Sequence, residues 1–114
     1  MAFRQRKDNL EEKEELRVAR LELASALASL TRPAEVERFF EDVFTKAETR
    51  DIALRWRIFQ LLYDGMTQRE IGERLGVSLC KITRGSKFLK GRGSVVRKIL
   101  QRRESADKQK GEQS

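Results

Sequence analysis

Histidine is absent from the 114 residues, and there is one cysteine, Cys80. A single thiol can form neither an intrachain disulfide nor a thiolate cluster around a metal ion, and the usual zinc ligand and general base is missing. Paired carboxylates occur only on helix faces that we expect to be exposed, so no nucleophile and base can be assembled with defined roles. These shortages argue against an enzyme and against a metal site.

Proline, aromatic residues and long apolar runs are also scarce. The chain has one proline and 7% aromatic residues, a composition that favours helices with solvated faces over a strand-rich core. No apolar run approaches the roughly 18 residues that span a bilayer, and the first residues lack the apolar region of a signal peptide. The sequence therefore predicts a soluble, cytoplasmic, all-α protein that makes no membrane contact.

Charge is plentiful but unevenly distributed. Residues 1–66 carry 12 basic and 13 acidic side chains, residues 67–103 carry 11 and 2, and residues 104–114 carry 2 and 3. The whole net charge of +7 thus originates in the middle segment. Such a concentrated positive field suits a polyanion, and nucleic acid is the expected one. A basic surface that is only solvated is the alternative.

Apolar residues recur at spacings of three and four, which predicts amphipathic helices. The first helix carries more apolar surface than a chain of this length covers, so its stripe is expected to lie against a second subunit. A flexible arm is expected at 1–8, a helical domain at 9–103 and a disordered polar tail at 104–114. The predicted helices are 9–30, 33–44, 46–64, 68–75, 79–90 and 95–103.

Residues 67–90 have the signature of a helix-turn-helix. Thr67-x-x-Glu70 is a capping box, Gly76 permits the positive φ of the turn, and Ser78 can cap the next helix. Gly72 is expected to let the two helices cross closely. Leu79 and Ile82 are expected to face the core, with Phe88 and Leu89 as further candidates. A hairpin of two helices whose outer face is only solvated is the alternative.

The start of the second of these helices combines short polar, basic and small apolar side chains, which can reach base edges in a major groove. Leu79 and Cys80 are candidates for thymine methyl contacts, and Lys81 and Thr83 for hydrogen bonds to bases. The full set of candidate DNA-binding residues is Gln68, Arg69, Ser78, Leu79, Cys80, Lys81, Thr83, Arg84, Lys87 and Lys90, of which Gln68, Arg69, Lys87 and Lys90 are placed for phosphates.

The stretches Thr67-Gln-Arg-Glu-Ile71 and Leu75-Gly-Val-Ser-Leu-Cys-Lys-Ile-Thr-Arg-Gly-Ser86, followed by Leu89-Lys90, closely resemble the Trp repressor family. A repressor of this family is one of the proteins from which the docking of a helix-turn-helix on DNA is known. The resemblance implies an intertwined homodimer of six-helix subunits. It also implies L-tryptophan as corepressor and a palindromic double-stranded operator at genes of tryptophan biosynthesis or transport.

The resemblance also implies ligand-binding residues. Arg55 and Arg84 match the arginines that sandwich the indole ring, and Arg84 also pairs with the ligand carboxylate. The complete implied set is Asp42 and Phe44 through their backbone carbonyls to the ammonium, Thr45 to the carboxylate, Arg55, Arg84, Gly85 beside the ring, and Phe88. Asp42, Lys81 and Phe88 depart from the residues that the family commonly has there.

Simpler roles are available for three of these residues. Arg55 could form a salt bridge with Asp51, Arg84 could contact a phosphate, and Thr45 could act only as a helix cap.

Two functions other than a tryptophan-dependent repressor are also considered. A repressor-like protein with another or no small-molecule ligand is disfavoured by the pair Arg55 and Arg84. A general basic nucleic-acid-binding protein is disfavoured by the base-reading pattern at 79–84.

Overall fold

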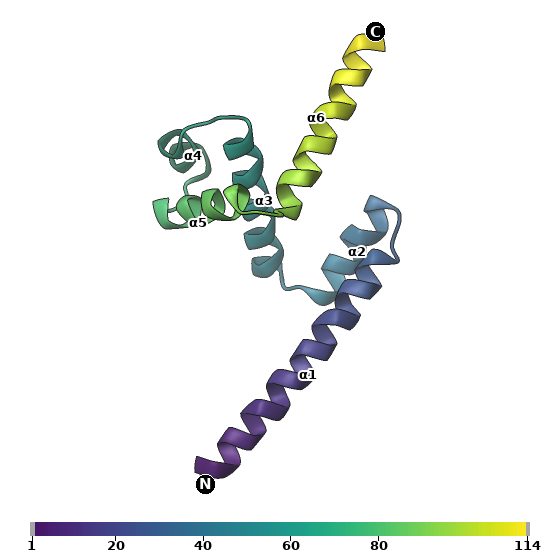
Figure 1. Cartoon of the computed structure of the whole chain (residues 1–114), viewed down its shortest axis with the longest axis vertical. Coiled ribbons are helices and arrows are strands. Elements are labelled where there is room, and N and C mark those ends of the chain that lie inside the picture. The colour runs from purple at the N-terminus through teal and green to yellow at the C-terminus, as the bar shows by residue number, and fades with distance from the viewer. Residues whose placement is uncertain (1, 114) are drawn as a thin grey trace. The chain divides into compact units, whose positions relative to one another are not determined.

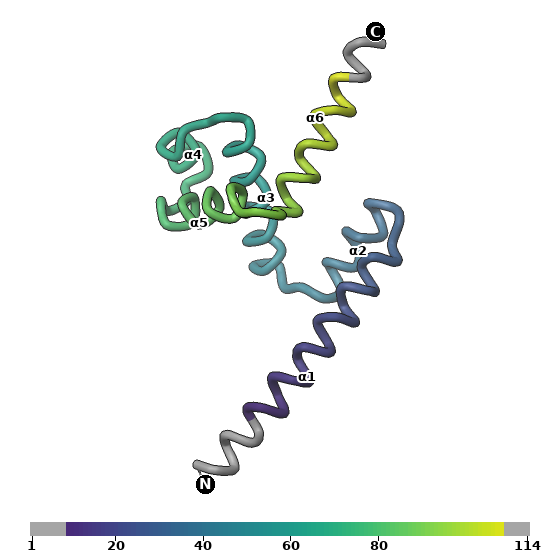
Figure 2. The backbone as a smooth tube through the Cα atoms, in the orientation of Figure 1, coloured from purple at the N-terminus to yellow at the C-terminus, as the bar shows by residue number. Residues whose placement is uncertain are grey.

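The computed structural model describes the backbone of residues 2–113 and the side chains of residues 9–108. Figure 2 traces the path of the backbone through the Cα atoms. Every regular element in the described backbone is an α-helix, which confirms the predicted fold class. The helices are α1 (Ala2–Ala28), α2 (Pro33–Val43), α3 (Lys46–Tyr63), α4 (Gln68–Leu75), α5 (Leu79–Lys90) and α6 (Val95–Gln113) (Figure 1).

The helix boundaries follow the sequence most closely between residues 33 and 90, where every expected end lies within one residue of the observed one. The outer helices are longer than expected. α1 begins at Ala2, and α6 continues past the expected end at 103 to Gln113. Residues 104–108 are helical and exposed, whereas the side chains of the arm 1–8 and of 109–114 lie outside the described residues. The division into arm, domain and tail stays a prediction.

The chain forms two compact units, residues 1–45 and residues 46–114. The first unit contains α1 and α2, and the chain reverses direction between them (Figure 1). Pro33 occupies the first turn of α2, where its fixed φ suits the helix. No residue of α2 is fully buried, and Leu16 of α1 is 59% exposed. One copy of this unit therefore leaves much of its apolar surface in contact with water.

The second unit has a well-defined core at the crossing of α3, α4 and α5. Ile58 and Leu61 from α3 pack with Ile71 from α4 and Ile82 from α5, and both Ile71 and Ile82 are 0% exposed. Burying each of these side chains contributes about 1.5–3 kcal/mol. The core therefore determines how α4 and α5 are held on α3. Leu62, Met66, Leu75 and Val77 pack around it.

On α3, Ile58 and Leu61 are the only fully buried residues among those described, and Ile52 is 38% exposed. Two expectations about burial were wrong. Leu79 and Phe88 were expected near the core, but they are 62% and 57% exposed. The physical reason is that α5 packs on α3 through a narrow face formed by Ile82, Gly85 and Leu89.

A glycine does allow close helix packing, but at a different position from the expected one. A Cβ atom at Gly85 of α5 would lie 3.0 Å from Cγ2 of Ile58, whereas a Cβ atom at Gly72 would lie 3.6 Å from Cδ1 of Ile82, an ordinary contact distance. Gly85 is buried and Ile58 cannot move away easily, because it is 2% exposed. The close approach therefore joins α3 to α5.

A polar contact joins α3 to α6. The Tyr63 hydroxyl at the end of α3 donates a hydrogen bond to the Glu104 carboxylate, which also pairs with Lys108 at 3.5 Å. The hydrogen bond raises the pKa of Tyr63, and burial and nearby carboxylates act in the same direction. It also lowers the pKa of Glu104 from its ordinary value of 4.5, assisted by the positive charge of Lys108. This contact lies in the part of α6 that the sequence did not predict to be helical.

We expect Gly72→Ala and Gly85→Ala to change stability in opposite directions. Alanine is favoured over glycine in a helix by about 1 kcal/mol, so Gly72→Ala should stabilise the protein by up to that amount. Gly85→Ala should destabilise it by about 1–3 kcal/mol through overpacking against Ile58. Urea unfolding of both variants beside the wild type measures the difference. Equal stabilisation by the two substitutions would contradict the close packing of α5 on α3.

We expect Tyr63→Phe to raise the pKa of Glu104, because the variant lacks the donor that stabilises the ionised carboxylate. The ionised carboxylate contributes stability above its unfolded pKa, and this contribution is lost as the pH falls through the lower folded pKa. Acidification should therefore lower the free energy of unfolding of the variant by less than that of the wild type. Carbon-13 NMR titration of the glutamate carboxyls measures the shift, and an unchanged Glu104 pKa would rule out the hydrogen bond in solution.

Candidate nucleic-acid interface and ligand cavity

The predicted helix-turn-helix is present, and local hydrogen bonds determine where its helices begin. The Thr67 hydroxyl accepts a hydrogen bond from the Glu70 amide at 3.2 Å, and the Ser78 hydroxyl accepts one from the Lys81 amide at 3.4 Å. Between the helices, Gly76 has a φ of 66°, a left-handed conformation that side chains disfavour. The three-residue turn therefore connects α4 directly to α5.

The candidate DNA-binding residues form one largely exposed surface on α5 and the start of α4. Ser78, Leu79, Cys80, Lys81, Thr83, Arg84, Lys87 and Lys90 are all exposed. The exposure of Leu79, which contradicts its expected place in the core, makes its methyl groups available to a groove. The first turn of α5 contains no acidic residue, and Lys87 and Lys90 lie in its last turn. The surface thus presents cations without nearby carboxylates on the same helix.

The two candidates on α4 differ in their surroundings. Gln68 is half-buried and accepts a hydrogen bond from the Thr83 hydroxyl at 3.4 Å, so it connects α4 with α5. Arg69 is exposed and pairs with Glu73 at 3.4 Å. Because that pair is fully solvated, it costs little to break when a phosphate approaches. Both positions are compatible with contacts to a DNA backbone.

A cavity of about 440 Å³ lies between α3 and α5 in the second unit. Its volume falls within the range of small-molecule sites. Its lining combines an apolar floor with charged side chains of both signs. The lining residues are Asp51, Leu54, Arg55, Ile58, Phe59, Lys81, Arg84, Gly85 and Phe88.

Four of the sequence-predicted ligand residues line this cavity: Arg55 from α3, and Arg84, Gly85 and Phe88 from α5. The guanidinium carbon of Arg84 lies 5.6 Å from the centre of the Phe88 ring, a cation–π contact. Arg55 and Asp51 form no ion pair, although they lie one turn apart on α3. The simple salt bridge considered for Arg55 is therefore absent.

Asp51, Leu54, Ile58, Phe59 and Lys81 also line the cavity, but sequence reasoning did not assign them to the ligand. The sequence does contain a signal that the α3 residues line one cavity together. Their positions recur at helical spacing and so share one face of α3: 51, 54, 55, 58 and 59. The signal for Lys81 is its place one turn before Arg84 on α5. The orientation of α5 on α3 could not be inferred from the sequence.

The remaining predicted ligand residues belong to the first unit or its end. Asp42 is exposed, Phe44 follows α2 with its ring 5.6 Å from that of Phe40, and Thr45 directly precedes α3. The Phe44 amide donates to the Phe40 carbonyl at 2.8 Å and so ends α2. The ligand roles implied for these three residues stay predictions.

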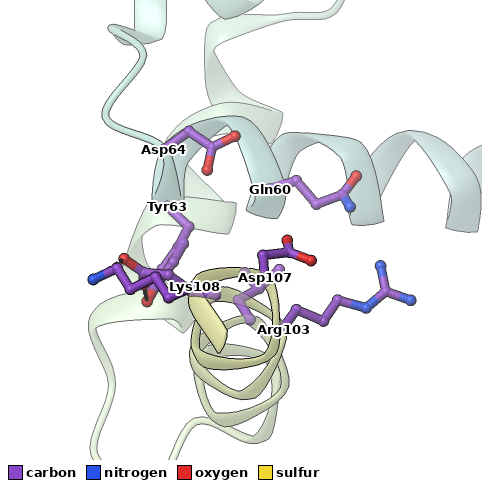
Figure 3. A pocket seen from close by; sticks show the side chains of 8 residues that line it. Gln60, Tyr63, Asp64, Arg103, Asp107 and Lys108 are labelled. Carbon is purple, nitrogen blue, oxygen red and sulfur yellow. Dashed lines mark hydrogen bonds and ion pairs between the residues drawn. The ribbon is translucent and has the colours of Figure 1, made fainter. Parts of the chain in front are cut away.

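A further cavity of the second unit, of about 630 Å³, lies between α3 and α6 (Figure 3). Gln60, Tyr63 and Asp64 line it from the α3 side, and Leu100, Arg103, Glu104, Asp107 and Lys108 line it from α6. Leu100 is the single aliphatic residue in this lining, and Glu104 is already satisfied by Tyr63 and Lys108. Ligand sites are mostly apolar with a few polar groups, so the α3–α5 cavity is the better candidate.

The chain matches the sequence model of the family described as Trp repressor protein over residues 20–104, which include α2 to α5 completely. It belongs to the Trp repressor family. This membership confirms the resemblance found in residues 67–90.

Curated relatives in this family are named Trp operon repressor homologs. The protein from Chlamydia trachomatis serovar D is 39% identical over 82 residues, covering 68% of this chain and 87% of the relative. The protein from Chlamydia caviae is 42% identical over 71 residues, covering 61% and 67%. The protein from Xylella fastidiosa strain M23 is 40% identical over 53 residues, covering 46% and 58%. No solved structure matches the chain at a comparable level of significance.

Members of the Trp repressor family are DNA-binding transcriptional repressors and not enzymes, which agrees with the function class inferred from composition. Over the described residues, no helix is long and apolar enough to cross a membrane. Within the same residues, no cluster of three or more cysteine or carboxylate side chains is arranged to hold a metal ion.

For this Trp repressor homologue, we expect Lys90→Ala to weaken DNA binding on all sequences, because a phosphate contact carries no sequence information. The slope of log affinity against log salt concentration should fall by about 1. Lys108→Ala is the matched control, since this exposed lysine pairs with Glu104 outside the basic segment. Fluorescence anisotropy at several salt concentrations measures both slopes. An unchanged slope for Lys90→Ala would exclude the phosphate contact.

Proposed function

We propose that this protein is a soluble, cytoplasmic, sequence-specific repressor that binds palindromic operator DNA as a homodimer with L-tryptophan as corepressor. Genes of tryptophan biosynthesis and transport are its proposed targets. The observation that carries this proposal is the position of Lys81 and Arg84. Both belong to the exposed surface of α5, and both line the α3–α5 cavity. A ligand in the cavity would thus touch the helix that faces DNA.

The chemistry of the cavity suits an aromatic amino acid. Leu54, Ile58 and Phe59 supply apolar surface for a ring, while guanidinium planes at Arg55 and Arg84 can stack on its faces. Arg84 can also pair with a ligand carboxylate in two parallel hydrogen bonds. L-Tryptophan has the largest ring system among the common amino acids, and the relatives are named Trp operon repressor homologs, which associates them with tryptophan genes.

Regulation requires that the ligand bind one orientation of α5 better than another. A ligand wedged between α3 and α5 makes contacts with both helices, so it favours the orientation in which Arg55 and Arg84 are at the right separation. The N-terminus of α5 would then fit the major groove. Lys87 and Lys90, in the last turn of α5, would hold phosphates beyond the bases contacted by the first turn.

Uncovered apolar surface supports the homodimer. Leu16, Val18 and Leu21 are exposed on α1, and Ile52 is exposed on α3. Exposed apolar side chains that come together on a surface commonly mark contact with another chain, and the proposed dimer would bring these together. A two-fold symmetric dimer would present two copies of α5 to half-sites about one helical turn apart.

Calorimetric titration with L-tryptophan tests the ligand without an operator. We expect saturable binding at one site per subunit, lost in Arg55→Ala and Arg84→Ala. Arg57→Ala is the matched control, because this exposed arginine lies on α3 but does not line the cavity. In DNA binding, Arg84→Ala should abolish both the ligand response and tight operator binding. No heat and no thermal shift with the wild type would leave a helix-turn-helix repressor with another trigger or none.

Selection from random duplex DNA in the presence of L-tryptophan tests the operator. A palindrome with two half-sites is expected, and removal of one half-site should weaken binding strongly if a dimer binds. Enrichment of no sequence, together with a steep salt dependence, would instead indicate a general basic nucleic-acid-binding protein.

A further inference from the structure

The charged side chains of α6 are divided between different sides of the helix. Its described carboxylates, Glu104 and Asp107, both line the α3–α6 cavity. Another set of side chains recurs at helical spacing, shares one face of α6 and contributes nothing to that cavity. This basic face of α6 consists of Lys98, Gln101, Arg102, Ser105 and Ala106. It therefore presents two cations, an amide and a hydroxyl, and it includes no carboxylate.

The two cations of the basic face are not used within the described part of the chain. Lys98 and Arg102 are exposed, and neither forms an ion pair or a side-chain hydrogen bond with a described residue. Arg103 differs from them, because its guanidinium carbon lies 5.8 Å from the centre of the Trp56 ring. Residues 74–103 contain ten basic side chains and no acidic one. The positive field of the basic face is therefore available to an anion outside the protein.

The basic face begins close to the end of the helix that carries the candidate DNA surface. Only residues 91–94 separate α5 from α6 (Figure 1). The Ser94 hydroxyl accepts a hydrogen bond from the Arg97 amide at 3.2 Å, which fixes where α6 begins. Arg92 is exposed in this connection, between Lys90 and the basic face. Exposed cations therefore continue from the last turn of α5 onto α6.

The donors of the basic face suit a nucleic-acid backbone. Lysine, arginine, serine and glutamine side chains are among those that bind phosphate oxygens, and such contacts carry no sequence information. We propose that the basic face of α6 binds phosphates of the DNA backbone in addition to those reached from α5. This inference deepens the proposed function, because it rests on DNA binding by the repressor. It requires neither L-tryptophan nor a known operator.

Fluorescence anisotropy with a long duplex of mixed sequence, at several salt concentrations, tests the inference. The double variant Lys98→Gln/Arg102→Gln should reduce the slope of log affinity against log salt concentration by about 1.8 per subunit, because each lost phosphate contact contributes about 0.9. Its affinity at about 0.1 M salt should fall by roughly tenfold or more. The charge-conserving variant Lys98→Arg/Arg102→Lys should retain the wild-type slope.

A matched control separates phosphate contacts from a general loss of charge. Arg57→Gln/Lys108→Gln removes the same charge from exposed positions of the same unit that lie outside the basic face, so it should change the slope little. Combining Lys98→Gln/Arg102→Gln with Lys90→Ala should add the two reductions, because the two surfaces reach different phosphates. Urea unfolding of each variant checks that a weaker affinity does not reflect a damaged fold.

The possible failures differ in what else they affect. An unchanged slope in Lys98→Gln/Arg102→Gln, or an equal reduction in the control, would show that the basic face is only solvated and would leave the proposed repressor intact. Failure of the wild type to bind the duplex at any salt concentration would overturn this inference together with the proposed DNA binding.

Discussion

The close packing of α5 on α3 is the constraint on which the rest of the second unit depends. Gly85 allows it, because any side chain there would press against Ile58 in the core. Because α5 packs on α3 only through this narrow face, the rest of its surface takes no part in the core. One flank carries the exposed cations, and the edge next to α3 forms a wall of the ligand cavity. The contact with the core, the candidate DNA surface and one wall of the α3–α5 cavity thus share one helix.

This sharing supplies the physical route that the proposed function needs between ligand and DNA. Lys81 and Arg84 are part of the exposed surface and of the cavity lining at once, so a ligand in the cavity would alter the position of groups on the candidate DNA surface. Coupling between two sites needs an element that both contact, and α5 is such an element. In this chain the cavity lining also contains Asp51 and Lys81.

The sequence predicted the local features of the site well. Thr67 and Ser78 cap their helices through hydrogen bonds to residues three positions on, and Gly76 has the expected left-handed conformation. The predictions of which apolar side chains are buried were wrong at two positions. Leu79 and Phe88 are apolar and were expected near the core, but they are exposed because α3 covers only one narrow face of α5.

The pair Arg55 and Arg84 followed from the family resemblance. The sequence by itself determined the helical class, the bounds of α4 and α5 and the basic surface. These features depend on spacing and on contacts within a few residues, so they can be read along the chain. Tertiary structure alone decided that Gly85, and not Gly72, makes the close approach, and that Asp51 lines the same cavity as the arginines. Those facts depend on how helices distant in sequence are oriented on a common core, which local spacing does not specify.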